Sequence, residues 1–295
     1  MKRYITVAKT AGFCFGVSRA MKLAERLCDS GKKVNTLGPI IHNPQAVAAL
    51  ERKGVTVVNS VDECKKGNTV VIRSHGVPKS IYEEIENAGL EYEDATCPFV
   101  EKIHKIVEKA SARERTILIA GDKNHPEVEG IMGFAQTPAF VFESLEELND
   151  ILNNIPNCQK NQITALSQTT FDSILWKKSE KIIEKVCTNA EIFDTICDAT
   201  SKRQKEAEML SRKSDLMIVI GGRQSSNTAK LKSICQKNCK TVLCETADEL
   251  DYRLFENAEQ IGITAGASTP AVIIKSVLER TEKIIDTVDN KEELL

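Results

Sequence analysis

The sequence predicts an α/β protein made of three similar small α/β units with parallel sheets, arranged about a pseudo-threefold axis around a central cavity. Short β-branched runs such as TVVIRS and LMIVIGG alternate with helical stretches such as KSIYEEIENAG, the pattern of βα units. The same order of features also occurs three times at a period of roughly ninety residues, which is too long for a solenoid. We expect the units to span residues 1–96, 97–193 and 194–295.

Each repeat begins with a cysteine that opens a predicted helix. These segments are CFGVSRAMKLAERL at Cys14, CPFVEKIHKIVEKA at Cys97 and CDATSKRQKEAEML at Cys197. Two strands follow in each repeat, and each strand runs into a polar loop. The first loops are LGPIIHNPQAV, IAGDKNHPEVEG and IGGRQSSNTAKL, and the second are VIRSHGVP, ALSQTTFD and ITAGASTP. Because functional loops gather at the carboxyl ends of parallel strands, we expect all of these loops to face the cavity.

Composition narrows the class of protein. The chain has 295 residues, of which 41% are hydrophobic and 28% are charged, so it can bury a sizeable core. Its formal net charge is -2 and its basic residues form no block, which argues against nucleic-acid binding. The N-terminal MKRYITVAKTAGF has no apolar run of the length of a signal peptide or a membrane span. We therefore expect a cytoplasmic protein that does not bind a membrane.

The cysteines at the three repeat starts are candidate metal ligands. Ten cysteines without an export signal do not predict disulfides, because cytosolic thiols stay reduced. A helix N-terminus favours the thiolate form. Three thiolates cannot close a structural zinc site, which takes four protein ligands, but they can hold a cubane by three of its irons. Cys14, Cys97 and Cys197 therefore predict a [4Fe-4S] cluster with one open iron; the alternative is that they are core residues preserved by duplication.

The other seven cysteines are better explained as structural. Four of them stand alone in helices or connectors: Cys28, Cys64, Cys158 and Cys187. The remaining three, Cys235, Cys239 and Cys244, form a C-x3-C-x4-C run that could suggest a metal site. That run passes from a helix into a strand within one repeat, so its sulfurs need not converge.

Histidines and small polar residues predict an anion site. His42, His75 and His125 fall in the loops expected to face the cavity, whereas His104 lies in the middle of a predicted helix. The third repeat has small polar side chains in the same loops: Ser225, Ser226, Asn227 and Ser268. These groups donate hydrogen bonds suited to the oxygens of a phosphate or diphosphate. The chain has no P-loop and no GxGxxG, which argues against an NTPase and against a bound nicotinamide.

A carboxyl group in HPEVEG is a candidate proton donor. Glu127 follows His125 and Pro126, so it can lie beside the anion site. Burial there would favour its acid form and make it a general acid. The alternative is a glutamate that only complements a helix N-terminus, and Glu129 is the nearest rival for the role.

Nine motifs in order carry a resemblance to a known family. They are AGFCFGVSRA, LGPIIHN, IRSHGVP, DATCPFV, HPEVEG, SQTTF, DTICDAT, SSNT and AGASTP. Over nearly its whole length the chain resembles the 4-hydroxy-3-methylbut-2-enyl diphosphate reductase family, the LytB-type iron–sulfur reductases that end the non-mevalonate isoprenoid pathway.

The resemblance implies a ligand set and a reaction. It implies that Cys14, Cys97 and Cys197 ligate the [4Fe-4S] cluster and that Glu127 supplies a proton, working with Thr169 and a bound water. The implied contacts to the diphosphate substrate are His42, His75, His125, Thr200, Ser225, Ser226, Asn227 and Ser268. The implied reaction is reductive dehydroxylation to isopentenyl and dimethylallyl diphosphate. Electrons would come from a ferredoxin- or flavodoxin-type protein, because the chain has no flavin or nicotinamide motif.

Two other functions fit an open-iron cluster. An iron–sulfur hydro-lyase would use the iron only as a Lewis acid, and a non-catalytic iron–sulfur sensor would need a partner-binding surface or a nucleic-acid module. A requirement for a reductant distinguishes a reductase from a hydro-lyase, and the sequence shows no module of the kind that a sensor needs.

Overall fold

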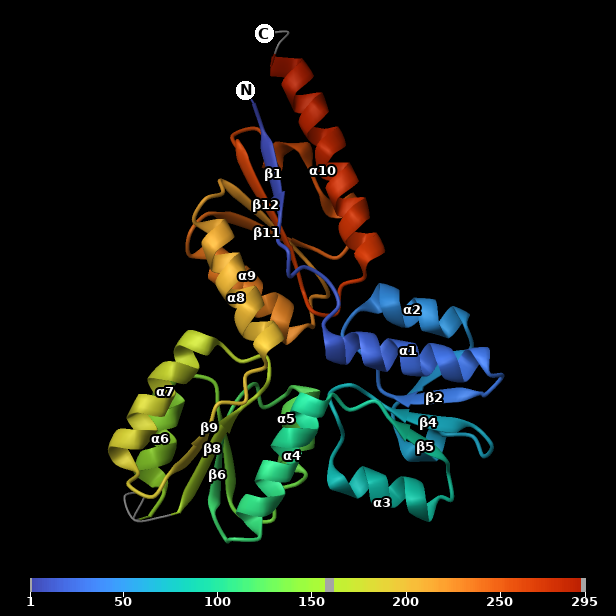
Figure 1. Ribbon diagram of the computed structural model, residues 1–295, viewed down its shortest axis with the longest axis vertical. Coiled ribbons are helices and arrows are strands. Elements are labelled where there is room, and N and C mark those ends of the chain that lie inside the picture. The colour runs from blue at the N-terminus through green and yellow to red at the C-terminus, as the bar shows by residue number, and fades with distance from the viewer. Residues whose placement is uncertain (1, 157–161, 293–295) are drawn as a thin grey trace. The chain divides into compact units, whose positions relative to one another are not determined.

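Three parallel four-stranded sheets with flanking helices are present in the computed structural model, which describes residues 2–156 and 162–292 (Figure 1). Every strand pair within these sheets is parallel. The predicted α/β class with parallel sheets is therefore confirmed. Each sheet has helices on its faces, because a parallel sheet must be buried on both sides.

The first sheet combines four strands in the order β3, β2, β4, β5. Their bounds are β2 Val34–Leu37, β3 Val55–Val58, β4 Thr69–Ile72 and β5 Tyr92–Asp94. The associated helices are α1 (Phe15–Asp29), α2 (Pro44–Arg52), the short η1 (Val61–Glu63) and α3 (Lys79–Asn87). Ile72 of β4 packs in one cluster with Val61 of η1 and Ile85 of α3, which places these two helices on one face. Helix α1 buries an apolar stripe that includes Ala20, Ala24 and Leu27.

The second sheet has the order β7, β6, β8, β9. Its strands are β6 (Thr116–Ala120), β7 (Ala139–Phe142), β8 (Ile163–Ser167) and β9 (Glu191–Phe193). Its helices are α4 (Pro98–Ser111), α5 (Pro126–Met132), α6 (Leu145–Asn154) and α7 (Ser173–Val186). Alternate residues of β6 face opposite sides, as the period of a strand requires. Ile117 and Ile119 pack with α4 and α5, whereas Leu118 packs with α6 and α7.

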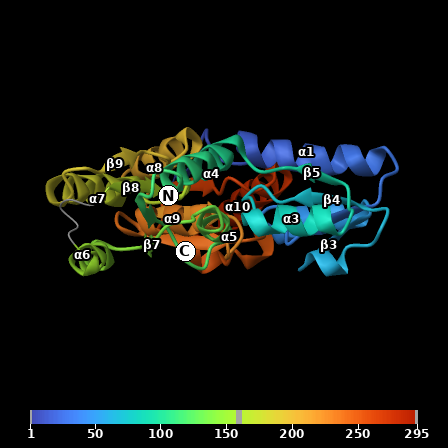
Figure 2. The same ribbon diagram turned by 90° about the horizontal axis from the view of Figure 1, so that it is seen from below.

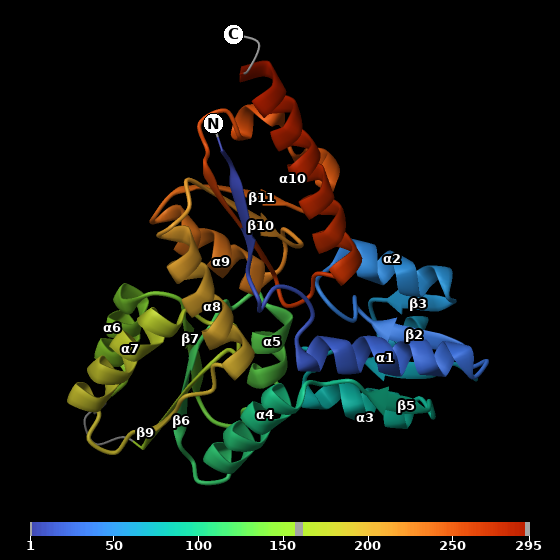
Figure 3. The same ribbon diagram turned by 45° about the horizontal axis from the view of Figure 1, so that its top comes forward.

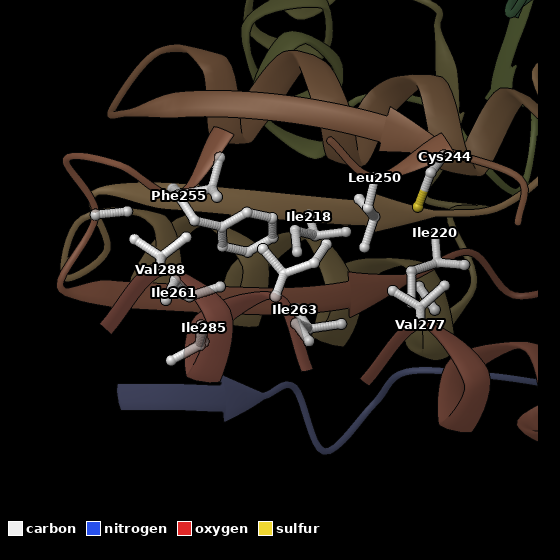
Figure 4. Close-up of a cluster of buried hydrophobic side chains, with 14 residues drawn as sticks. Ile218, Ile220, Cys244, Leu250, Phe255, Ile261, Ile263, Val277, Ile285 and Val288 are labelled. Carbon is white, nitrogen blue, oxygen red and sulfur yellow. The ribbon is translucent and has the colours of Figure 1, made fainter. Parts of the chain in front are cut away.

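The third sheet joins both ends of the chain. Its order is β1, β12, β10, β11, with β1 at Tyr4–Val7, β10 at Leu216–Ile220, β11 at Lys240–Cys244 and β12 at Gln260–Ala265. Helices α8 (Asp198–Ser211) and α9 (Ser226–Gln236) pack on Met217 and Val219. The other face carries η2 (Ala247–Glu249), η3 (Tyr252–Leu254) and α10 (Ala271–Glu292), which runs along the sheet in Figure 3. Figure 4 shows this core, in which Ile218 and Ile263 of the sheet lie near Phe255 and Ile285.

The N-terminal strand belongs to a sheet formed by the end of the chain. Strand β1 pairs in parallel with β12, with Tyr4 opposite Gln260, and the side chain of Arg3 bonds Asp289 of α10. Part of the expected unit 1–96 therefore lies in the sheet of the expected unit 194–295. The backbone divides into two compact units, one of residues 1–15, 42–46 and 198–295 and one of residues 16–41 and 47–197. The three predicted ranges and their arrangement around a cavity stay predictions.

The three sheets repeat one plan. In each, a cysteine precedes a helix (α1, α4 or α8), and the strand after that helix leads into a second helix (α2, α5 or α9). Helix α4 contacts α5, and α8 contacts α9. Strands β5, β9 and β1 each directly precede one of these cysteines. Within the described residues, no helix has both the length and the apolar character needed to cross a membrane.

Candidate active site

The backbones of the three repeat cysteines are held in the same way. Each donates its N–H to the carbonyl oxygen of a residue two positions past the end of a central strand, β12, β4 or β8. The pairs are Cys14 with Ala267 at 3.1 Å, Cys97 with Ser74 at 3.0 Å, and Cys197 with Thr169 at 3.2 Å. Each cysteine is thereby tied to the second polar loop of the sheet that contains the strand before it, β1, β5 or β9, and the sequence predicted these loops to be functional.

The three thiols also share a local environment. Helices α1, α4 and α8 begin at the residue after Cys14, Cys97 and Cys197, and all three cysteines are partly buried. Space at Cys97 depends on Gly16, because a Cβ atom at Gly16 would lie 2.5 Å from the Cys97 Sγ.

The C-x3-C-x4-C run is structural. Cys235 of α9 packs with Met217 and Val219, whereas Cys244 of β11 packs on the other face of the sheet with Ile218 (Figure 4). Burial raises the pKa of each of these two thiols to about 12, so both stay protonated. Thiols on opposite faces of a sheet cannot share a metal ion, which agrees with the expectation from the sequence.

The other solitary cysteines differ from the repeat cysteines. Cys187 is buried in the core beside α6 and α7. Burial raises the pKa of the Cys28 and Cys64 thiols, which makes them poor ligands. Cys158 lies outside the described residues.

Glu127 and Thr169 form a buried pair. Glu127 lies in the first turn of α5 and is 2% exposed, and Thr169 follows β8. The backbone N–H of Thr169 donates to Glu127 Oε1 at 2.6 Å, and its hydroxyl lies 2.7 Å from Oε2. The carbonyl of Thr169 accepts the N–H of Cys197. One residue thus links a buried carboxyl group to a repeat cysteine.

The environment of Glu127 favours its acid form. Burial raises the pKa of this carboxyl group to about 7, although the two hydrogen bonds from Thr169 oppose the rise. When Glu127 is protonated, its O–H can donate to the Thr169 hydroxyl, which can then pass on its own proton. Glu129, the rival residue, is instead exposed and pairs with Arg73 at 3.5 Å.

Two of the predicted histidines lie next to each other in the same unit. The rings of His75 and His125 meet edge to face with 5.5 Å between their centroids. His125 caps α5, and its Nδ1 accepts the N–H of Glu127 at 3.1 Å. Because Nδ1 is the acceptor, the proton of the neutral ring lies on Nε2. His125 therefore positions the helix of Glu127 and presents a donor at its other nitrogen.

His104, which the sequence placed in a helix and outside the site, packs beneath one of these loops. His104 of α4 is buried, its ring stacks on Phe134 at 4.2 Å, and burial lowers its pKa to about 4. A Cβ atom at Gly76, whose φ is +74°, would lie 2.6 Å from the His104 ring. Neutral His104 thus fills the space beneath the turn that carries His75.

The remaining predicted residues lie in the other unit. The hydroxyl of Ser268 donates to the His42 carbonyl at 3.1 Å. A Cβ atom at Gly222 would lie 2.7 Å from the same oxygen, so the approach of the His42 loop requires glycine there. Thr200, which is 2% exposed, lies in the first turn of α8, and Ser226 is the first residue of α9.

Asn227, next to a helix cap, is buried without a hydrogen-bond partner among the described residues. The hydroxyl of Ser225 accepts the N–H of Thr228 at 3.3 Å and so caps α9. Asn227 is 4% exposed, yet within the described residues neither its amide nitrogen nor its amide oxygen has a hydrogen-bond partner. A buried amide without partners costs free energy, and a polar ligand would relieve that cost.

Sequence reasoning missed two polar residues in the same loops. Gln168, which precedes Thr169, is 1% exposed. Its buried amide nitrogen donates a hydrogen bond to none of the described residues. Arg73 bonds the Gly76 carbonyl at 3.3 Å and contacts Gly38, joining two loops. Both stand in the recurring motifs, SQTTF and IRSHGVP, so position within the repeat could have identified them.

Comparison with known proteins assigns the family. The family model described as "LytB protein" matches residues 5–282. The chain belongs to the LytB family. The resemblance predicted from the motifs is therefore confirmed.

Individual relatives of this LytB chain carry one name. A 4-hydroxy-3-methylbut-2-enyl diphosphate reductase of Caldanaerobacter subterraneus subsp. tengcongensis is 44% identical over 292 residues, covering 97% of this chain and 99% of the relative. A reductase of the same name from Clostridioides difficile is 42% identical, covering 95% and 99%.

Solved structures agree with this LytB assignment. The structure of an (E)-4-hydroxy-3-methyl-but-2-enyl diphosphate reductase, described as the terminal enzyme of the non-mevalonate pathway, is 39% identical with a TM-score of 0.67, covering 95% of this chain and 99% of that one. The Plasmodium falciparum E-1-hydroxy-2-methyl-but-2-enyl-4-diphosphate reductase is 26% identical with a TM-score of 0.89, covering 95% and 88%.

The raised pKa of Glu127 predicts a pH-dependent stability. The folded state holds this proton more tightly than the unfolded state, so the contribution is complete below about pH 4.5 and is lost as pH rises through about 7. In Glu127→Gln that contribution cannot titrate. The free energy of unfolding of the Gln variant should therefore gain about 3 kcal/mol relative to the original chain between pH 5 and pH 8, measured by denaturant unfolding. A constant difference across that range would contradict a protonated Glu127.

Proposed function

We propose that this chain is a 4-hydroxy-3-methylbut-2-enyl diphosphate reductase, which converts (E)-4-hydroxy-3-methylbut-2-enyl diphosphate to isopentenyl and dimethylallyl diphosphate. The names of its LytB relatives favour this reaction over a hydro-lyase or a sensor. The observation that carries the proposal is the buried Glu127, which hydrogen-bonds Thr169 at 2.6 and 2.7 Å while Thr169 accepts the N–H of Cys197. A carboxyl group that can hold a proton is thereby linked, through Thr169, to a proposed cluster ligand.

Cys14, Cys97 and Cys197 are the proposed ligands of a [4Fe-4S] cluster. Their equivalent N–H anchors, helix starts and partial burial fit three thiolates of one set. Gly16 leaves room at the Cys97 sulfur, where a Cβ would meet it at 2.5 Å. The thiols of Cys235 and Cys244 are buried and protonated, and neither cysteine stands at the start of a helix. The residues present therefore fit a cluster held by three cysteines.

The reaction consumes two electrons and two protons and releases the substrate hydroxyl as water. When bound, the cluster would supply the electrons and a Lewis-acidic iron for the hydroxyl oxygen. The protein must deliver protons where water is scarce. Glu127, with its pKa raised to about 7, can hold a proton near neutral pH and release it through the Thr169 hydroxyl.

The diphosphate is the proposed partner of the polar loops. Asn227, with both amide atoms lacking described partners, has an unmet need for a polar ligand. His125 presents Nε2–H because its Nδ1 accepts from Glu127. We include His42, His75, Thr200, Ser225, Ser226 and Ser268 in this site, since their hydroxyl and imidazole groups can donate to diphosphate oxygens.

The electrons are proposed to come from another protein, a ferredoxin or flavodoxin, because the chain has no flavin or nicotinamide motif. The proposal includes a cytoplasmic location, because thiolate ligands persist in a reducing compartment.

Cluster content tests the ligand set. Replacing Cys97 by Ser should remove or cripple the cluster, because an alcohol is a far poorer ligand for iron than a thiolate. Iron and sulfide analysis after anaerobic purification measures this, and Cys235→Ser is the matched control that should keep full content. Full content and normal turnover in Cys97→Ser would end the three-ligand hypothesis.

Asn227 tests the diphosphate site. Asn227→Leu keeps the side-chain size but removes hydrogen bonds to a charged ligand, which should cost about 1.5–3 kcal/mol, or about ten- to a hundredfold in affinity. Stability without ligand should stay equal or rise, because an unpartnered buried amide is removed. Titration calorimetry with inorganic diphosphate and thermal unfolding measure the two effects. Unchanged affinity would place the anion elsewhere.

Turnover tests proton delivery. Glu127→Gln keeps the shape of the side chain but cannot release a proton, so turnover with saturating chemical reductant should fall at least about a hundredfold while cluster content stays near normal. In the unaltered chain, the rate should decline as pH rises through about 7, where Glu127 ionises. Thr169→Ala should be milder, since a water molecule can replace the hydroxyl. A wild-type rate in Glu127→Gln would exclude the carboxyl group as the acid.

A further inference from the structure

Basic residues recur at fixed distances from the three repeat cysteines. Positions five, eight and twelve residues after each cysteine are exposed. They are Arg19, Lys22 and Arg26 after Cys14; Lys102, Lys105 and Lys109 after Cys97; and Lys202, Lys205 and Met209 after Cys197. Steps of three and four residues put each set on one side of its helix. Eight of these nine positions are cationic in a chain whose net charge is only -2.

Two of these helices belong to one unit and meet at their N-terminal ends. The Arg19 guanidinium of α1 donates to the carbonyls of Thr96 at 2.9 Å and Asp94 at 3.2 Å, just before α4. Gly16 of α1 lies against the Cys97 sulfur. Figure 2 shows α1 and α4 along the same side of this unit. We call the exposed cations Arg19, Lys22, Lys102 and Lys105 the basic face.

Helix stability does not explain the basic face. Cations near a helix N-terminus oppose the macrodipole, which favours acidic residues there. Helix α1 has no acidic residue in its first turn. Lys105 pairs with Glu101, but among the described residues neither Lys22 nor Lys102 has an ion-pair partner. These two exposed cations are therefore available to acidic groups of a partner protein.

The surface beside these cations has the character of an interface. Phe99 lies two residues after Cys97 and is 45% exposed. Protein interfaces commonly combine aromatic residues at their centre with a polar, solvent-accessible rim. The apolar contact and the positive rim both lie at the N-terminal end of α4, next to Cys97.

We propose that the basic face is the docking surface for an acidic electron-carrier protein of the ferredoxin type. This rests on the proposed function, in which electrons must reach a cluster held partly by Cys97. An acidic carrier complements the cations, which would steer its approach and orient it toward the cysteine end of α4. The positive charge near the N-terminal ends of α1 and α4 would then hold the carrier close to Cys97, where electrons must enter.

The test compares charge reversals in the cluster-loaded protein. The double variant Lys22→Glu/Lys102→Glu changes the basic face. Lys65→Glu/Lys66→Glu makes the same charge change on exposed residues before β4, at the opposite end of that strand from the loop that bonds Cys97. Two readouts are required: the affinity for an oxidised acidic ferredoxin by titration calorimetry, and turnover with reduced ferredoxin or with methyl viologen. Circular dichroism and iron content verify folding.

The basic-face variant should bind ferredoxin about tenfold or more weakly and lose most of the salt dependence of binding. Its turnover with methyl viologen, which needs no docking surface, should stay within about twofold of the unaltered chain, and the control variant should resemble the unaltered chain. Equal weakening in both variants, or none in either, would overturn the proposal. Absent turnover with both reductants alongside intact, charge-dependent binding would instead count against the proposed reductase activity.

Discussion

The hydrogen bond from each repeat cysteine to the loop beyond a central strand is the constraint on which the candidate site depends. The N–H of each repeat cysteine, Cys14, Cys97 or Cys197, donates to such a carbonyl, and a helix begins at the next residue. The bond fixes a thiol at the carboxyl end of a parallel sheet and aims a helix N-terminus at it. In each case the loop, the thiol and the helix N-terminus are therefore positioned together.

Thr169 shows how this constraint extends to chemistry. Its carbonyl holds Cys197, while its N–H and hydroxyl hold Glu127. Burial supplies the pKa rise to about 7, and Thr169 supplies the geometry. These two effects oppose each other, since hydrogen bonds to a carboxylate favour ionisation and desolvation disfavours it. The balance leaves a group able to hold a proton near neutral pH, which a general acid requires.

The turn that carries His75 is supported by a neutral ring and by the guanidinium of Arg73, which donates to the Gly76 carbonyl at 3.3 Å. His104 is kept uncharged by burial and packs under the turn of His75, where Gly76 leaves room for the ring. Other cations lie on the exposed sides of α1 and α4. The buried carboxyl group of Glu127 and the exposed cations thus occupy separate places, because desolvation disfavours ionised groups more than neutral ones.

The sequence by itself determined the α/β class, the recurring cysteine and loop motifs, and the LytB family, because periodicity and motif order are local properties of a chain. It also separated Cys235 and Cys244 from the repeat cysteines. Only the tertiary structure decided that β1 completes the sheet of β12 and that Thr169 joins Glu127 to Cys197. It also decided that Asn227 is buried with no hydrogen-bond partner in the described part of the chain. Pairing across the whole chain length, and the burial that shifts a pKa, depend on contacts between residues distant in sequence, which no local pattern encodes.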